Sequence, residues 1–279
     1  MAIWTFGSIN LDHVYRVPHL VTAGETLAAQ SYRVGLGGKG ANQSVAAARA
    51  GAHVRHVGAV GRDGLTALET LRGFGVDVER VAVGDVPTGH AIISVDPQGE
   101  NSIVIFDGAN RALGATHVVA LRGAGPGDTL LLQNETSMQV EAARAFAGSR
   151  VIYSAAPFDA DAVRAVLPHV SLLVMNAGEA EALRAAMGSL PPVEMVVTRG
   201  SEGAEWIGVQ PLRVPAYAVM AVDTTGAGDC FTGTLAAGLD SGLAPAQAMR
   251  RAATAAAIQV TRHGAADAMP TAAEVDAMM

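Results

Sequence analysis

The second half of the chain alternates short apolar runs with amphipathic helical patterns. Three such pairs follow one another, with apolar runs at 129–132, 151–153 and 172–174 and helical patterns at 138–146, 160–166 and 179–187. Strands that alternate with helices at this spacing form βαβ units. The chain has 279 residues and is 50% hydrophobic, so it is long enough to bury a full core. We therefore predict an α/β fold, a three-layer α/β/α sandwich with a mostly parallel central sheet.

Two other segments, residues 11–34 and 87–106, show strand-like alternation instead. In the second of them, Asp96-Pro97-Gln98-Gly99 supplies turn chemistry between two candidate strands. A helical pattern at 41–50 separates the two segments, so we predict two excursions from one core that comprises residues 1–10, 35–86 and 107–279. In space they would form a small antiparallel β lid over a crevice, where water exclusion would take place.

The charge balance argues against some partners. With 19 basic and 26 acidic residues and a pI near 5.6, the surface disfavours nucleic acid and acidic membranes, so an anionic ligand must be bound locally. The single cysteine, Cys230, cannot form an intramolecular disulfide and is typical of a reducing compartment. We find no basic leader and no apolar run of about 18 residues, and we expect a cytoplasmic protein without a membrane segment.

The segment from Asp223 to Phe231 joins a β-like run, ending at Val222, to a helical pattern that continues to about Leu239. Its small residues Gly226-Ala227-Gly228 leave backbone N–H groups uncovered at the helix start, which predicts an anion site. Asp229 in the same turn would ordinarily only complement the helix dipole. Beside an anion site, however, its carboxylate could accept the proton of an attacking hydroxyl, and the two features together meet the requirements of phosphoryl transfer.

Residues 35–40 satisfy the pattern GxGxxG, which also occurs in dinucleotide-binding enzymes. Such a site needs a buried parallel strand before it, but residues 30–34 are polar at alternate positions, as in a one-sided sheet. No GxxxxGK[ST] phosphate loop occurs either. The alternative is that these glycines let the backbone approach a polyhydroxylated ligand, to which Asn42 offers a donor and an acceptor; the simpler interpretation of Asn42 is a helix cap.

The motif DTTGAGDCF at 223–231 resembles the C-terminal signature of the phosphofructokinase B family, the ribokinase-like sugar and nucleoside kinases. GLGGKGANQ at 35–43 and the start at 7–12 resemble the ribokinase branch more than fructokinases or adenosine kinases. The resemblance extends from Gly7 to Pro270. It implies a ribokinase-like fold and transfer of the ATP γ-phosphoryl group to the primary hydroxyl of a small sugar, D-ribose first. The alternatives are another sugar or nucleoside as substrate, or a non-catalytic sensor of sugar or nucleotide.

The resemblance also implies roles for individual residues. The catalytic group would be Asp229 as base with Gly226, Ala227 and Gly228 as the anion hole. The sugar would contact Asn10, Asp12, Gly38, Lys39, Asn42, Glu135 and Asp229. ATP would contact Asn176, Thr198, Gly200, Ser201, Gly203 and Gly228. Glu179 would position Mg²⁺, and a possible K⁺ would lie near Asp223 and the carbonyls of Thr225, Gln259, Arg262 and Gly264.

Some of these residues have simpler interpretations on their own. Glu135 could be a solvated loop acid, Asn176 and Glu179 a helix cap and a surface acid, and residues 198–203 a plain hairpin turn. Asp223 could be a helix cap or a metal ligand.

The sequence departs from the family pattern at two places: Ala268 replaces a hydroxyl-bearing residue near the cation site, and Ser154 replaces the usual Asn. We also predict a homodimer formed through the edges of the lid strands, since an unpaired edge is a liability.

Overall fold

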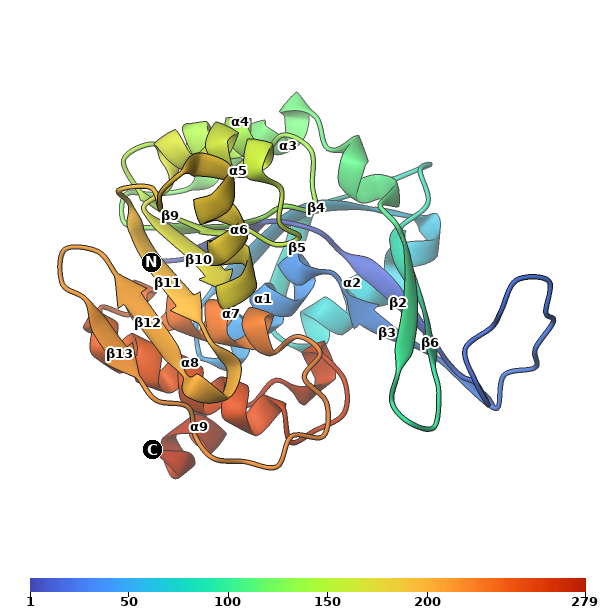
Figure 1. Cartoon of the computed structure of the whole chain (residues 1–279). Helices are drawn as coiled ribbons and strands as arrows, with labels where there is room; N and C mark the ends of the chain where they lie inside the picture. The colour runs from blue at the N-terminus through green and yellow to red at the C-terminus, as the bar shows by residue number, and fades with distance from the viewer.

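The computed structural model describes residues 1–279 and consists of a nine-stranded sheet between two layers of helices, with a separate four-stranded sheet beside them (Figure 1). The strand order of the large sheet is β13-β12-β11-β10-β9-β8-β1-β4-β5. Its strands are β1 (Ile3–Phe6), β4 (Val54–Gly61), β5 (Val76–Gly84), β8 (Thr129–Gln133), β9 (Arg150–Ser154), β10 (Leu172–Asn176), β11 (Glu194–Thr198), β12 (Ala204–Ile207) and β13 (Leu212–Val214). All neighbours from β5 to β11 pair in parallel, and only β12 runs in the opposite direction, antiparallel to both β11 and β13.

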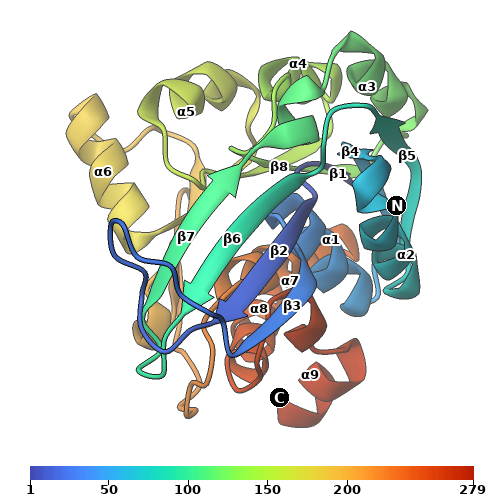
Figure 2. The same cartoon turned by 90° about the vertical axis from the view of Figure 1, so that its right-hand side faces the viewer.

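The helices form one layer on each face of this sheet (Figures 1 and 2). Successive side chains of β1 point to opposite faces, so Ile3 enters one buried apolar cluster and Trp4 the other. The first cluster contains residues of α1 (Lys39–Arg49), α2 (Leu65–Gly73), α7 (Ala227–Asp240), α8 (Pro245–Gln259) and α9 (Ala272–Met278). On the opposite face lie α3 (Ala115–Ala120), α4 (Gln139–Ala145), α5 (Ala160–Val166) and α6 (Ala177–Met187). The predicted three-layer sandwich with a mostly parallel sheet is confirmed.

The small sheet has the order β3-β2-β6-β7 (Figure 2). Its strands are β2 (Asn10–Arg16), β3 (Ser31–Gly37), β6 (Gly89–Val95) and β7 (Asn101–Phe106), and residues 17–30 contain no strand. We expected antiparallel pairing throughout, and this was wrong for the central pair, because β2 and β6 run parallel. The reason is topological: β2 follows β1 and β6 follows β5, and both preceding strands run in the same direction in the large sheet.

The β-like run that we expected to end at Val222 is not a strand. The last strand of the chain ends at Val214, and the following residues form a loop in which Met220 is 85% exposed. The N–H groups of Val222 and Asp223 both donate to the carbonyl of Val260, just after α8. This backbone is therefore tied to a helix end, where an apolar run needs no sheet partner.

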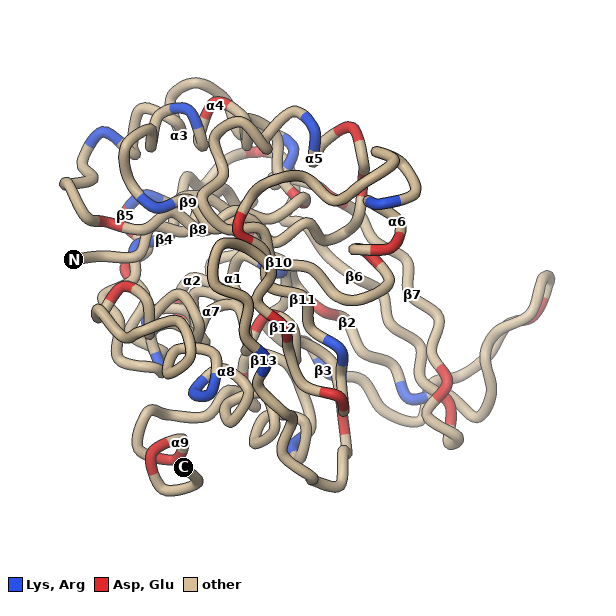
Figure 3. The backbone as a smooth tube through the Cα atoms, turned by 60° about the vertical axis from the view of Figure 1, so that its left-hand side comes forward, with Lys and Arg blue, Asp and Glu red and all other residues tan.

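Acidic and basic residues are interspersed over the elements that surround the sheet (Figure 3). None of the helices combines the length and the apolar character that crossing a membrane requires. The division of the chain into a core and a lid at the boundaries given above stays a prediction.

Candidate active site

The N-terminus of α7 opens the site. Gly226 precedes the helix with φ 78°, a left-handed conformation that favours glycine, and a Cβ there would come within 3.0 Å of the Ala265 side chain. At Gly228, by contrast, a Cβ would meet nothing within 4 Å, so this backbone faces open space. The first-turn N–H groups of a helix lack intrahelical acceptors. The start of this helix lines the polar cavity described below, and the Ala227 N–H donates to the Thr224 carbonyl at 3.2 Å. That these groups bind an anion stays a prediction.

Asp229 lies in the same turn and is only 8% exposed. Its two carboxylate oxygens accept hydrogen bonds from consecutive residues of α1, Oδ2 from Asn42 Nδ2 at 3.1 Å and Oδ1 from Gln43 Nε2 at 3.0 Å. Burial raises the pKa of Asp229 above its usual value, although Lys39 and the two amides act in the opposite direction. The result is a buried carboxyl with fixed orientation and increased basicity.

Asn42 is not the helix cap that the simpler interpretation suggested. The helix begins at Lys39 after Gly38, and Asn42 lies one turn inside it. Its side chain is 6% exposed, and its Oδ1 is buried without any hydrogen-bond partner. An unpaired buried acceptor is costly, so a donor that reached this oxygen would be bound favourably.

Lys39, the only lysine of the chain, lies at the start of α1 among three acids. Burial would lower the pKa of its amine, but the negative charges of Asp229, Glu135 and Glu179 outweigh burial and raise the pKa. Lys39 therefore stays positively charged beside the anion site.

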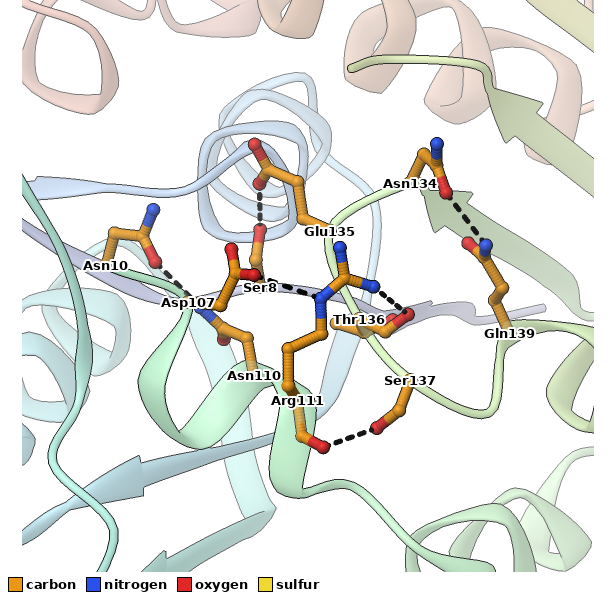
Figure 4. Close-up of polar contacts among 10 residues, drawn as sticks. All are labelled: Ser8, Asn10, Asp107, Asn110, Arg111, Asn134, Glu135, Thr136, Ser137 and Gln139. Atoms are coloured by element: carbon orange, nitrogen blue, oxygen red, sulfur yellow. Dashed lines mark hydrogen bonds and ion pairs between the residues drawn. The ribbon is translucent and has the colours of Figure 1, made fainter. Parts of the chain in front are cut away.

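Glu135 follows β8 and is partly buried, so it is not a solvated loop acid (Figure 4). Its Oε2 accepts from the Lys39 backbone N–H at 2.9 Å and from the Ser8 hydroxyl, whose oxygen in turn accepts from the Gly40 N–H at 3.1 Å. Burial is the main cause that raises the pKa of Glu135. These contacts hold the start of α1 against the loop after β1.

Asn10 and Asp12 project from β2 in the small sheet. Asn10 Oδ1 accepts from Asn110 Nδ2 at 2.7 Å, and Asn110 Oδ1 accepts from the Ile9 N–H at 3.0 Å (Figure 4). Burial and the nearby charge of Glu135 raise the pKa of Asp12 to about 6, against the opposing effect of Arg33. Gly38 lies against the backbone at the start of β2. Its φ is 89°, and a Cβ there would approach the Asn10 backbone nitrogen to 3.0 Å.

Two adjoining cavities meet at the start of α7. The larger, about 370 Å³, is mostly apolar, and its walls include Thr198, Gly200, Ser201, Gly203, Tyr217, Gly228, Phe231 and Ala257. The smaller, about 220 Å³, is polar and includes Lys39, Ser154, Asn176, Glu179, Thr198, Gly226, Ala227, Gly228 and Asp229. Thr198, Thr224, Ala227 and Gly228 line both cavities. The structure thus brings together most of the residues predicted for the anion hole and for the nucleotide.

Asn176 and Glu179 do form the helix cap that was the simpler interpretation. Asn176 Oδ1 accepts from the Glu179 N–H, and Glu179 Oε2 accepts from the Asn176 N–H, both at 2.8 Å. Burial raises the pKa of Glu179. Because both residues also line the smaller cavity, the capping role does not remove them from the site.

The residues predicted to hold a cation converge behind α7. Gln259 Nε2 donates to the carbonyl of Thr225 at 2.7 Å and to that of Gly264 at 3.1 Å, and Asp223 accepts from the Thr225 and Gly264 N–H groups at 2.9 Å each. Gln259 Oε1 is buried without a partner. The side chain of Arg262 does not join this group, because it pairs with Glu274 at 2.6 Å.

Sequence reasoning missed four residues that complete the site, namely Ser8, Gln43, Asn110 and Gln133. Gln43 and Gln133 are polar side chains with 0% and 1% exposure. The only available signal was position, since Gln43 follows Asn42 and Gln133 ends the strand before Glu135. Their contacts depend on how α1 and β8 pack, which the sequence pattern does not specify.

Comparison with known proteins agrees with this geometry. Residues 2–272 match the family described as pfkB family carbohydrate kinase. The ribokinase of Haemophilus influenzae is 35% identical, over 96% of this chain and 95% of its own length. The crystal structure of the Thermotoga maritima ribokinase has a TM-score of 0.89 at 34% identity, covering 99% of this chain and 98% of that one. The Arabidopsis thaliana ribokinase complexed with ribose and ATP has a TM-score of 0.87 at 29% identity, covering 100% and 99%.

The fold and the site, an anion hole beside a buried carboxylate, define an enzyme of the carbohydrate kinase class. Within that class the chain belongs to the pfkB family. The predictions of family, fold and enzyme class are confirmed.

Proposed function

We propose that this enzyme transfers the γ-phosphoryl group of ATP to the primary hydroxyl of D-ribose and forms ribose 5-phosphate. The observation that carries the proposal is the position of Asp229, a buried carboxylate held by two amides in the first turn of the helix whose N-terminus faces the polar cavity. The similarity to ribokinases over nearly the whole chain supports ribose as the sugar.

In this mechanism, Asp229 accepts the proton of the sugar hydroxyl as the oxygen attacks the γ-phosphorus. The raised pKa of Asp229 supports this role, because a more basic carboxylate is a better proton acceptor. The N–H groups at Gly226, Ala227 and Gly228 would stabilise the charge on the transferred phosphoryl group. Lys39, positively charged beside the same cavity, would add to that stabilisation.

The sugar would lie between α1 and the small sheet. Its proposed ligands are Asn10, Asp12, Gly38, Lys39, Asn42 and Glu135, with Asp229 at the reacting hydroxyl. The unpaired Oδ1 of Asn42 supports this placement, since a sugar hydroxyl would satisfy it. The four-stranded sheet, comprising the segments predicted as 11–34 and 87–106, would act as a lid that excludes water from the phosphoryl group.

ATP would occupy the two adjoining cavities. The apolar one suits the base, with Thr198, Gly200, Ser201 and Gly203 at its rim, and the polar one suits the phosphates, with Asn176 and Gly228 beside them. Mg²⁺ binds few protein carboxylates and completes its shell with phosphate and water, so the single free oxygen of Glu179 fits it. When bound, Mg²⁺ would neutralise charge on the phosphates.

A monovalent cation such as K⁺ fits the group behind α7. The carbonyls of Thr225 and Gly264 converge on one side-chain nitrogen, Asp223 lies beside them, and Gln259 Oε1 lacks a partner. Such a set of oxygens, several of them carbonyls, is what K⁺ prefers. The buried Ala268 supplies no hydroxyl, so any activation by K⁺ would depend on these oxygens.

We further propose a homodimer through the lid and a cytoplasmic location. In β7, which pairs only with β6, every residue is exposed, including Ile103, Val104, Ile105 and Phe106. An edge strand with free backbone groups and apolar side chains is a surface that a second copy would cover.

The substrate assignment predicts ribose-dependent release of ADP. With Mg²⁺ and ATP, ribose should give the highest kcat/KM in a panel with deoxyribose, fructose and adenosine, and added K⁺ should increase it. A higher kcat/KM for another member of the panel would replace ribose as the substrate. Folded protein that binds ATP without turnover on any of them would favour a non-catalytic sensor.

The pKa of Asp12 predicts how sugar binding depends on pH. Because its carboxylate is a stronger hydrogen-bond acceptor than its neutral acid, affinity for ribose should decrease as pH falls through about 6. Between pH 7 and pH 5 we expect about a tenfold increase in Kd, measured by calorimetry without nucleotide. Asp12→Asn should bind weakly at both pH values with little change between them, whereas the exposed control Asp85→Asn should keep the full dependence. The same pH dependence in Asp12→Asn would exclude this carboxyl as its source.

The dimer predicts that a charge on the exposed face of β7 separates the subunits. Val104 is 63% exposed, and Val104→Lys should convert a dimer to a monomer in light scattering at micromolar concentration. Val209→Lys, at an 89% exposed apolar position between β12 and β13, is the matched control and should remain dimeric. A monomeric mass for the unmodified protein would refute the dimer.

A further inference from the structure

Two buried glutamines connect the central sheet to the proposed base. Gln133, the last residue of β8, donates from Nε2 to Gln43 Oε1 at 2.8 Å, and Gln43 donates from Nε2 to Asp229 Oδ1 at 3.0 Å. Both glutamines are at most 1% exposed. The chain of contacts therefore runs from the sheet through α1 to α7 without reaching solvent.

The donor and acceptor capacities of the three side chains fix the direction of these hydrogen bonds. An ionised carboxylate can only accept, so the amide that meets Asp229 must present its NH₂ group. The side-chain oxygen of Gln43, Oε1, then points away from Asp229 and requires a donor, which the NH₂ group of Gln133 supplies. The charge on Asp229 thus orders both amides, and both amides in turn favour the charged carboxylate.

The surrounding backbone leaves room for these side chains by means of two glycines. A Cβ at Gly7 would lie 2.4 Å from Gln133 Oε1, and a Cβ at Gly233 would lie 2.4 Å from the backbone carbonyl of Gln43. The second contact lets α1 and α7 approach closely enough for Gln43 to reach Asp229. The charged groups nearest the base are Lys39 from the same helix, Glu135 from the loop after β8 and Glu179 from α6, and none of them bonds to the Asp229 carboxylate.

We propose that Gln43 and Gln133 are positioning residues for phosphoryl transfer, which hold Asp229 in its orientation and keep it ionised. This inference rests on the proposed role of Asp229 as base. It assigns a function to two residues that line neither of the two adjoining cavities. A purely structural role would affect stability and leave the proton affinity of the base unchanged.

Substitution by methionine, which is nearly isosteric with glutamine, tests the role of the hydrogen bonds from Gln133 to Gln43 and from Gln43 to Asp229, here called the relay. In Gln43→Met the carboxylate loses a donor, so the acidic limb of kcat against pH, measured at saturating ribose to remove the effect of Asp12 on binding, should move upward by about one pH unit. At pH values on the acidic limb of both profiles the variant should be about tenfold slower than the unmodified enzyme, and the deficit should shrink as the pH rises. Gln133→Met keeps the hydrogen bond from Gln43 to Asp229 and removes only the donor to Gln43. It should therefore shift the acidic limb in the same direction by a smaller amount.

Gln139→Met is the matched control, because Gln139 Nε2 donates to Asn134 Oδ1 outside the relay, and its profile should superpose on that of the unmodified enzyme. An unshifted limb in Gln43→Met would overturn the proposal. If that variant does not fold, an unshifted limb in Gln133→Met would do the same. Absence of ribose-dependent turnover in the unmodified enzyme would instead contradict the proposed function, so the two failures are distinguishable.

Discussion

The site depends on one burial: a carboxylate, Asp229, is placed between two closely packed helices and away from water. Burying a charge is unfavourable unless it is hydrogen-bonded, and Asn42 and Gln43 supply one donor to each oxygen. Those donors lie on α1, whose start is held in turn by Glu135 and Ser8. The position of the proposed base therefore depends on α1, which is itself held at its start and which also carries Lys39.

The second constraint is the open edge of the parallel sheet. Ligands of α/β sheets bind beyond the carboxyl ends of the strands, and here the ends of β9, β10 and β11 line the polar cavity. The loops after β1 and β8 supply Ser8 and Glu135, which hold the start of α1. The strands of the small sheet follow β1 and β5 at this edge. One arrangement of strands thus places a polar and an apolar cavity at the start of α7, with the small sheet continuing from the same edge.

Much of this could be predicted from the sequence because it is encoded locally. The alternation after residue 129 predicted the parallel sheet, and the motif at 223–231 predicted a helix start, which the structure places beside a polar cavity. Contacts between distant segments could not be predicted: Gln133 and Gln43 are 90 positions apart, and Asn110 and Asn10 are 100 apart. The wrong predictions had the same origin, since the parallel pairing of β2 with β6 depends on the whole topology, and the run ending at Val222 is an exposed loop whose backbone bonds to the end of α8 instead of to a sheet.

The central claim is that Asp229 acts as the base, and the Asp229→Asn variant tests it most directly. Asparagine keeps the size of the side chain but cannot accept the hydroxyl proton. We expect a single-turnover rate of phosphoryl transfer to ribose that is lower by at least about a thousandfold. Binding of ribose and ATP, measured by calorimetry on the same preparation, should change far less. Near-normal turnover in this variant would contradict the mechanism.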